Sequence, residues 1–77
     1  MKEFLKAIYE KGRVIIKEKT TYSNHIFTVD VKRIEEDDDS FDILSENGSF
    51  YFKKKDACVL EDGLIFATEN SQTYLQV

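Results

Sequence analysis

The sequence predicts a mostly β protein, all-β or α+β, in which a short N-terminal helix precedes an antiparallel meander of six to seven strands. Three observations lead to this class. Apolar residues recur four positions apart before Gly12, they alternate with a period of two after it, and Asn47-Gly48 and Asp62-Gly63 are typical of tight hairpin turns. A meander of this size is expected to form a small barrel or a strongly curved sheet.

The segment from Lys2 to Lys11 is the expected helix. Phe4 and Ile8 lie four residues apart, which places them on one face of a helix. Gly12 follows and can adopt the left-handed conformation that ends a helix. Because so short a helix is not stable alone, we expect its apolar face to pack on the strands of residues 13–77.

The first expected strands follow Gly12. In residues 13–17 the apolar Val14 and Ile16 alternate with Arg13, Ile15 and Lys17, and residues 20–24 form a polar loop. The segment from His25 to Ile34 then alternates as one continuous strand, and Glu35 to Ser40 is an acidic connector. Three residues of that strand share its apolar face: Phe27, Val29 and Val31.

The segment from Phe41 to Lys54 is the clearest hairpin. With Asn47-Gly48 as the two central turn residues, Ile43 lies opposite Phe52 and Leu44 lies opposite Tyr51. Four apolar residues then gather on one face: Phe41, Ile43, Phe50 and Phe52. Tyr51 and the lysines that follow are left on the exposed face.

A second hairpin is expected around Asp62-Gly63. Its strands are residues 57–60 and 64–68, and this turn places Val59 opposite Phe66. Both faces are apolar, so we expect the hairpin to be covered on both sides or to lie in a barrel wall. A last strand is expected at residues 73–77.

Length and composition predict one domain, residues 1–77, in a reducing, cytoplasmic setting. The charged N-terminus is not typical of a signal peptide, and no apolar run is long enough to cross a bilayer. The single cysteine, Cys58, cannot form an intramolecular disulfide, and its apolar neighbours predict a buried, unreactive thiol.

Catalytic signatures are lacking, so we expect a protein that is not an enzyme and has no cofactor or metal. One His and one Cys cannot supply a four-ligand zinc site, and the acidic run does not have calcium-loop spacing. A catalytic pair of Cys58 and His25 is disfavoured because Cys58 lies in an apolar strand. The three glycines are too far apart to cradle a phosphate.

Charge is distributed unevenly along the chain. Residues 1–34 carry eight Lys/Arg and four Asp/Glu, whereas residues 35–77 carry three Lys and eleven Asp/Glu. The acidic run can imitate the charge of a nucleic-acid backbone and dock on a basic groove of a protein partner. Its five members are Glu35, Glu36, Asp37, Asp38 and Asp39. An ordinary solvated acidic loop is the alternative explanation of the run.

The expected function is therefore a small acidic binding module that docks on a protein partner, such as an inhibitory or accessory protein of a phage or mobile element. Exposed strand edges leave open a homodimer formed through one of them. The rival prediction is a small β-barrel that binds single-stranded nucleic acid through Tyr51, Lys53, Lys54 and Lys55. The net charge of −4 disfavours nucleic acid, and nothing in the sequence favours a membrane.

Overall fold

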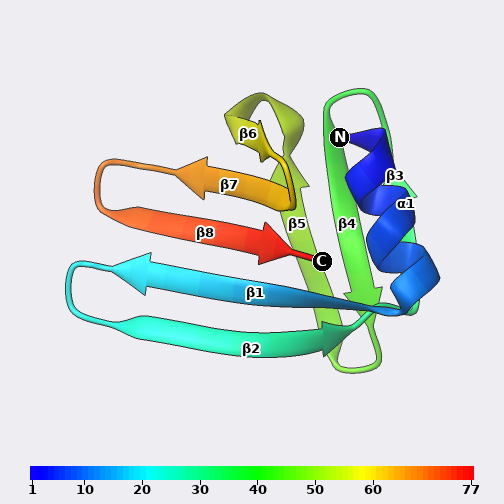
Figure 1. The fold of residues 1–77 in the computed structure, drawn as a ribbon, viewed down its shortest axis with the longest axis horizontal. Helices are drawn as coiled ribbons and strands as arrows, with labels where there is room; N and C mark the ends of the chain where they lie inside the picture. The colour runs from blue at the N-terminus through cyan, green and yellow to red at the C-terminus, as the bar shows by residue number, and fades with distance from the viewer.

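The chain forms one α-helix, eight β-strands and one turn of 3-10 helix in a computed structural model that describes residues 1–77 (Figure 1). The elements are, in order, α1 (Lys2–Lys11), β1 (Arg13–Thr20), β2 (Asn24–Asp30), β3 (Arg33–Glu36), β4 (Ser40–Ser45), β5 (Gly48–Lys53), η1 (Lys54–Asp56), β6 (Ala57–Leu60), β7 (Gly63–Ala67) and β8 (Ser71–Gln76). The predicted class, mostly β with a short N-terminal helix, is confirmed, but the strands number eight and do not close into a barrel.

The strands form two antiparallel sheets rather than one simple meander. The larger sheet has the order β2-β1-β8-β7-β6 and the smaller has the order β3-β4-β5. The prediction of a continuous meander is wrong because β1 pairs with β8, which places the fully buried Leu75 opposite Ile16. The expected strand from His25 to Ile34 is also divided, because the chain passes from one sheet to the other between β2 and β3.

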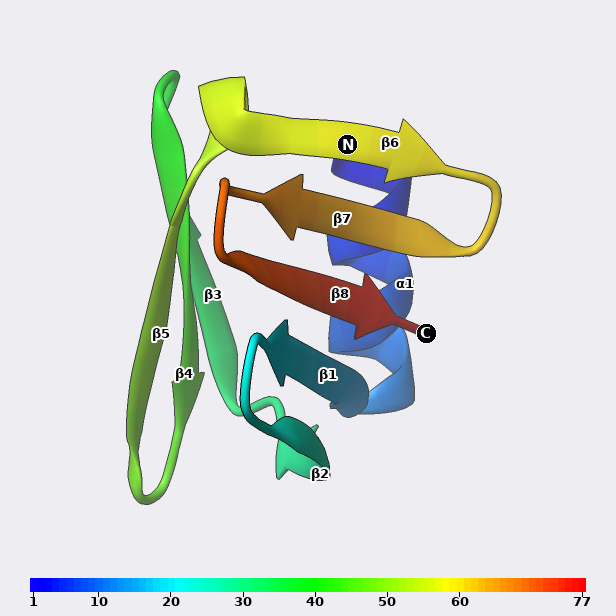
Figure 2. The same cartoon turned by 90° about the vertical axis from the view of Figure 1, so that its left-hand side faces the viewer.

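The two sheets pack crosswise, with the strands of the five-stranded sheet running across those of the three-stranded sheet (Figures 1 and 2). Such packing buries alternate residues of inner strands between the sheets, as at Val14 and Ile16 of β1. α1 lies against β1 and β3 at one end of this arrangement. The core consists of eleven buried apolar residues: Phe4, Leu5, Ile8, Val14, Ile16, Val29, Val31, Phe41, Ile43, Leu64 and Leu75.

The helix has the expected bounds and the expected ending. Gly12 has φ 77°, and its amide donates to the carbonyl oxygen of Ile8 at 2.9 Å. Phe4 and Ile8 are buried, so their shared face packs on the sheets as predicted. No helix in the structure combines the length and the apolar character that crossing a membrane requires.

Both hairpins exist, but their registers differ from the predicted ones by two residues. Ile43 lies opposite Phe50 rather than Phe52, and Val59 lies opposite Leu64 rather than Phe66. The central turn residues are Glu46-Asn47 and Glu61-Asp62, so each glycine follows its turn as the first residue of a strand. A shift of two preserves the face of every residue, which is why Phe41, Ile43, Phe50 and Phe52 still face the core side.

The edge position of β6 overturns two expectations about the second hairpin. β6 pairs only with β7, at the end of the five-stranded sheet. Cys58 is exposed rather than buried, Val59 retains 61% of its accessible surface, and Leu60 retains 39%. The prediction failed because an apolar sequence does not reveal whether a second layer covers both faces of a strand.

Candidate functional site

The two groups of site residues expected from the sequence meet at one place in the fold. An open hollow of about 620 Å³ lies where the β3–β4 turn, β5 and η1 come together. We call it the Tyr51 hollow, and its lining residues are Asp38, Asp39, Tyr51, Lys53, Lys54 and Lys55. It therefore joins the end of the acidic run to all four residues of the expected nucleic-acid site.

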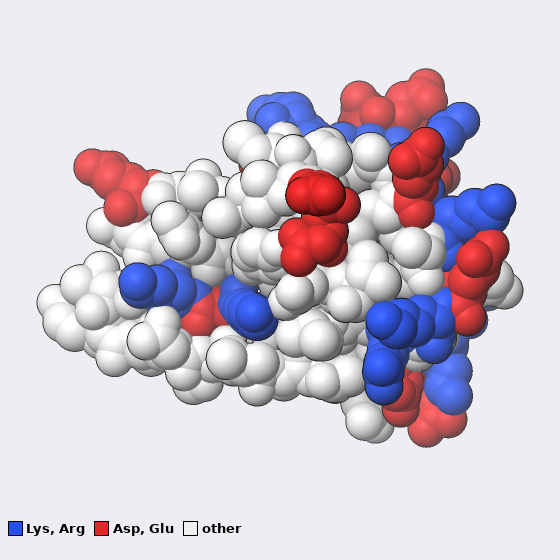
Figure 3. Space-filling model, in the orientation of Figure 1, with Lys and Arg blue, Asp and Glu red and all other residues white.

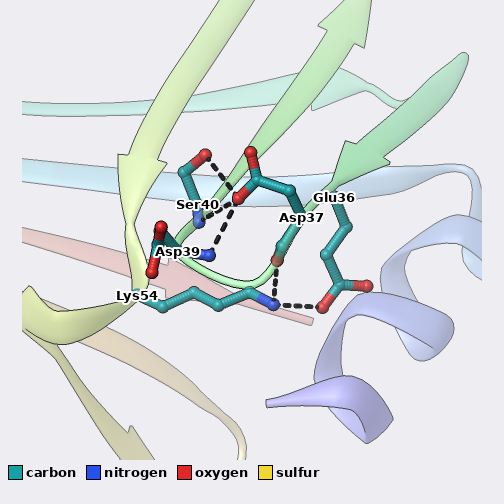
Figure 4. A network of polar contacts seen from close by, with 5 residues as sticks. All are labelled: Glu36, Asp37, Asp39, Ser40 and Lys54. Carbon is teal, nitrogen blue, oxygen red and sulfur yellow. Dashed lines mark hydrogen bonds and ion pairs between the residues drawn. The ribbon is translucent and has the colours of Figure 1, made fainter.

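The β3–β4 turn is organised by the Asp37 side chain (Figure 4). Its Oδ1 accepts hydrogen bonds from the Asp39 amide at 2.8 Å, the Ser40 amide at 2.7 Å and the Ser40 hydroxyl at 3.1 Å. These bonds favour the charged carboxylate and hold the pKa of Asp37 below its usual value of 3.8, with the Asp39 amide contributing most. Asp37 is thus occupied inside the turn.

Lys54 fastens this turn to the start of η1 (Figure 4). Its Nζ donates to Glu36 Oε2 at 2.7 Å and to the main-chain oxygen of Asp37 at 2.5 Å. Its backbone amide donates to the carbonyl oxygen of Asp39 at 2.9 Å. Because its ammonium group is engaged in this way, Lys54 stabilises the wall of the hollow and its charge is not free to bind a partner.

Only part of the acidic run remains available to a partner. Glu35 lies in β3, 3.5 Å from the Arg33 guanidinium, and Glu36 is paired with Lys54. The side-chain carboxylates of Asp38 and Asp39 have neither a hydrogen bond nor an ion pair within the chain. The run therefore presents two free carboxylates, and both line the Tyr51 hollow.

Tyr51 supplies the aromatic surface of the hollow. It lies on β5 with 58% of its surface exposed, on the face opposite Phe50 and Phe52. Phe52 packs inward against Phe41, at a ring-centroid distance of 5.3 Å. The core thus fixes the strand that presents Tyr51.

The hollow carries charges of both signs. Lys53 and Lys55 are exposed and unpaired, and they line the same hollow as the two free aspartates. Acidic and basic side chains also intermingle along the upper and right-hand parts of the surface in Figure 3. The separation of charge along the sequence is therefore not kept in space, because pairs such as Lys32–Glu46 join the two halves at 3.6 Å.

Other candidates from the sequence do not come together. His25 lies on β2 and Cys58 on β6, the two opposite edges of the five-stranded sheet. Four inter-strand spacings separate them, roughly 19 Å. Nowhere in residues 1–77 do three His, Cys, Asp or Glu side chains converge in an arrangement that could hold a metal ion.

Sequence reasoning missed the contact between Lys54 and Glu36, which are separated by 18 positions. The correct register of β4 and β5 would have revealed it. Ser40 lies opposite Lys53, so the turn before β4 must lie beside the residues after β5. Extending the β4–β5 pairing by one residue beyond Ser40 and Lys53 places Asp39 opposite Lys54.

Comparisons with protein-family models, with curated proteins and with solved structures find no match.

Proposed function

We propose that this protein is a non-enzymatic binding module that holds a protein partner at the Tyr51 hollow. One observation carries the proposal. The two unpaired carboxylates of the acidic run and the unpaired Lys53 and Lys55 surround an exposed tyrosine in a single hollow. Aromatic residues are enriched at the centre of protein-binding surfaces, and polar groups form the rim around them.

Each part of the hollow has a role in this proposal. Tyr51 is the anchor, because its ring buries a large apolar area at a small cost in conformational entropy while its hydroxyl stays able to hydrogen-bond. Asp38 and Asp39 attract a basic side chain of the partner, and Lys53 and Lys55 attract an acidic one. The bonds made by Asp37 and Lys54 hold these groups in place before the partner arrives.

The charge balance favours a protein over nucleic acid as the partner. With Lys54 engaged by Glu36, the free charges of the hollow are two lysines and two aspartates. A phosphate backbone attracted by Lys53 and Lys55 meets the repulsion of Asp38 and Asp39 at the same place. Base stacking on Tyr51 alone lacks the electrostatic attraction on which single-strand binding depends.

A narrower form of this proposal is that the protein is an inhibitory or accessory protein that docks on a basic groove of its partner through the acidic run. It now depends on Asp38 and Asp39, since the other three carboxylates have partners within the chain. Lys53 and Lys55 offset the attraction for a uniformly basic surface, so the partner's basic group must meet Asp38 and Asp39 while an acidic group meets the lysines. Salt screens both attractions.

The test compares Tyr51→Ala with Tyr22→Ala. Tyr22 is a matched control, because it is 97% exposed and lies in the β1–β2 turn outside the hollow. Both variants and the wild type are immobilised and used to capture proteins from a lysate of the source organism. We expect the same captured protein on the wild type and Tyr22→Ala, and at least tenfold less on Tyr51→Ala, as for an aromatic hot spot.

A second arm tests nucleic acid directly, using the fluorescence anisotropy of a labelled thymidine oligonucleotide. We expect no binding at physiological salt. Equal capture by Tyr51→Ala and the wild type would contradict the assignment of the hollow. Oligonucleotide binding that is lost in Tyr51→Ala and weakened in Lys53→Ala would replace the protein partner with single-stranded nucleic acid.

A further inference from the structure

The free edge of β6 is the least protected strand edge of the molecule. Four strands lie at sheet edges, and β6 is the only one of them without a charged side chain. Natural edge strands usually carry charges or proline, which prevent pairing with another chain. In Figure 2 β6 lies along the top of the five-stranded sheet with no strand beyond it.

The register of the β6–β7 hairpin determines which peptide groups face this edge. Leu60 and Gly63 flank the two-residue turn, and the pair next to such a turn is a hydrogen-bonded pair. Hydrogen-bonded pairs alternate along an antiparallel ladder, so Cys58 also directs its peptide groups toward β7. Ala57 and Val59 direct theirs to the free edge.

A second copy can pair with this edge in few ways. Residues opposite each other share a face of the sheet, and a two-fold axis perpendicular to the sheet keeps each residue on its own face. The axis must therefore lie midway between a residue of one strand and the same residue of the other strand. Centres at Cys58 and at Val59 give the greatest overlap of the two strands and use the free peptide groups of Val59 in both cases.

Charge selects the centre at Cys58. A centre at Val59 brings Asp56, which ends η1 just before β6, toward Asp62 in the β6–β7 turn of the second copy, which is repulsive. A centre at Cys58 instead brings Lys55, in η1 just before β6, toward Glu61 in the turn just after β6 of the second copy, twice by symmetry. Lys55 and Glu61 are exposed and have no ion-pair partner within the chain.

We propose that two copies of this chain associate through antiparallel pairing of β6 with β6, centred on Cys58. The pairing joins the two five-stranded sheets into one continuous sheet. Ala57 and Val59 exchange hydrogen bonds across the axis, and the two Cys58 residues form a close pair with no hydrogen bond between them, about 4.5 Å apart at Cα. Contact through so short a strand makes a weak, concentration-dependent dimer. Of the residues that line the Tyr51 hollow, only Lys55 takes part in it.

Charge reversal tests the ion pairs. In sedimentation equilibrium from micromolar to millimolar protein, we expect the dimer dissociation constant to rise about fivefold or more for Glu61→Lys and for Lys55→Glu. The double variant restores the opposite charges and should return to within about twofold of the wild type. A wild type that stays monomeric at millimolar concentration, or a double variant weaker than both single variants, would overturn the proposal.

Thiol trapping tests the register. Diamide takes two hydrogen atoms from two thiols and leaves a disulfide, so it traps cysteines that already face each other. We expect covalent dimer to form at least tenfold faster from the wild type than from Cys58→Ser carrying Val59→Cys, whose thiols lie diagonally. Faster trapping of the Val59→Cys variant would move the centre to Val59 and overturn the assigned register.

Discussion

Asp37 shows at the level of one residue how an acidic run can serve the fold. Three donors within the turn satisfy a single carboxylate oxygen, and the next carboxylate along the chain, Asp38, has no such partner. The two side chains are chemically identical and adjacent, so composition does not separate their roles. The bond from the Asp39 amide, two residues on, makes Asp37 the first residue of an Asx turn.

Replacing Asp37 with Ala should lower the melting temperature, whereas Asp38→Ala should leave it unchanged. The pKa of Asp37 is lowered in the fold, so its contribution to stability is fully present above the unfolded value of 3.8 and is lost as pH falls through the lower folded pKa. The difference in melting temperature between wild type and Asp37→Ala should therefore shrink below about pH 4. A difference that stays constant down to pH 2 would show that Asp37 acts without its charge.

Gly63 is required by packing rather than by its backbone angles. A Cβ atom at this position would overlap the carbonyl oxygen of Leu75 on the neighbouring strand β8. We expect Gly63→Ala to lower the free energy of unfolding by about 3 kcal/mol, because β7 and β8 must move apart. At Gly48 a Cβ meets no atom within 4 Å, so Gly48→Ala should cost only backbone strain, about 1 kcal/mol. Urea unfolding measures both, and an equal or smaller cost at Gly63 would contradict the packing role.

The hairpins show what can be predicted at the level of elements. The Asn-Gly and Asp-Gly signals correctly located both hairpins, and alternation correctly assigned Phe41, Ile43, Phe50 and Phe52 to one face. The register was missed because the Asn-Gly dipeptide is compatible with two turns of equal length. One has Asn47-Gly48 as its central residues, and the other, which the structure has, is shifted by one residue to Glu46-Asn47. Phe41 and Phe52 lie opposite each other with stacked rings only in the observed register, and the turn sequence does not encode that contact.

Cys58 provides a test of the edge position of β6. Because the thiol is exposed, it should react with Ellman's reagent in the native protein within a few-fold of the rate in urea. The measurement is made at micromolar protein, where the proposed dimer is dissociated. Protection of more than a hundredfold in the native state would mean that β6 is covered.

At the level of the whole molecule, the crosswise packing of two sheets creates the candidate site. The sequence predicts the strands but not the pairing of β1 with β8 or the division between β2 and β3, because both depend on contacts between distant segments. The same packing folds the acidic run back onto η1, where Lys54 meets Glu36. Local periodicity identified Tyr51 and Lys53 as exposed, but only the fold places them beside Asp38 and Asp39.

The most direct test of the central claim is a map of amide chemical-shift changes when the captured partner is added to ¹⁵N-labelled protein. We expect the largest changes at Asp38, Asp39, Tyr51, Lys53 and Lys55, with the β1–β2 turn around Tyr22 unaffected. Changes of that pattern would establish the Tyr51 hollow as the binding surface. Changes confined to the outer face of the five-stranded sheet, with the β3–β4 turn and β5 unmoved, would contradict it.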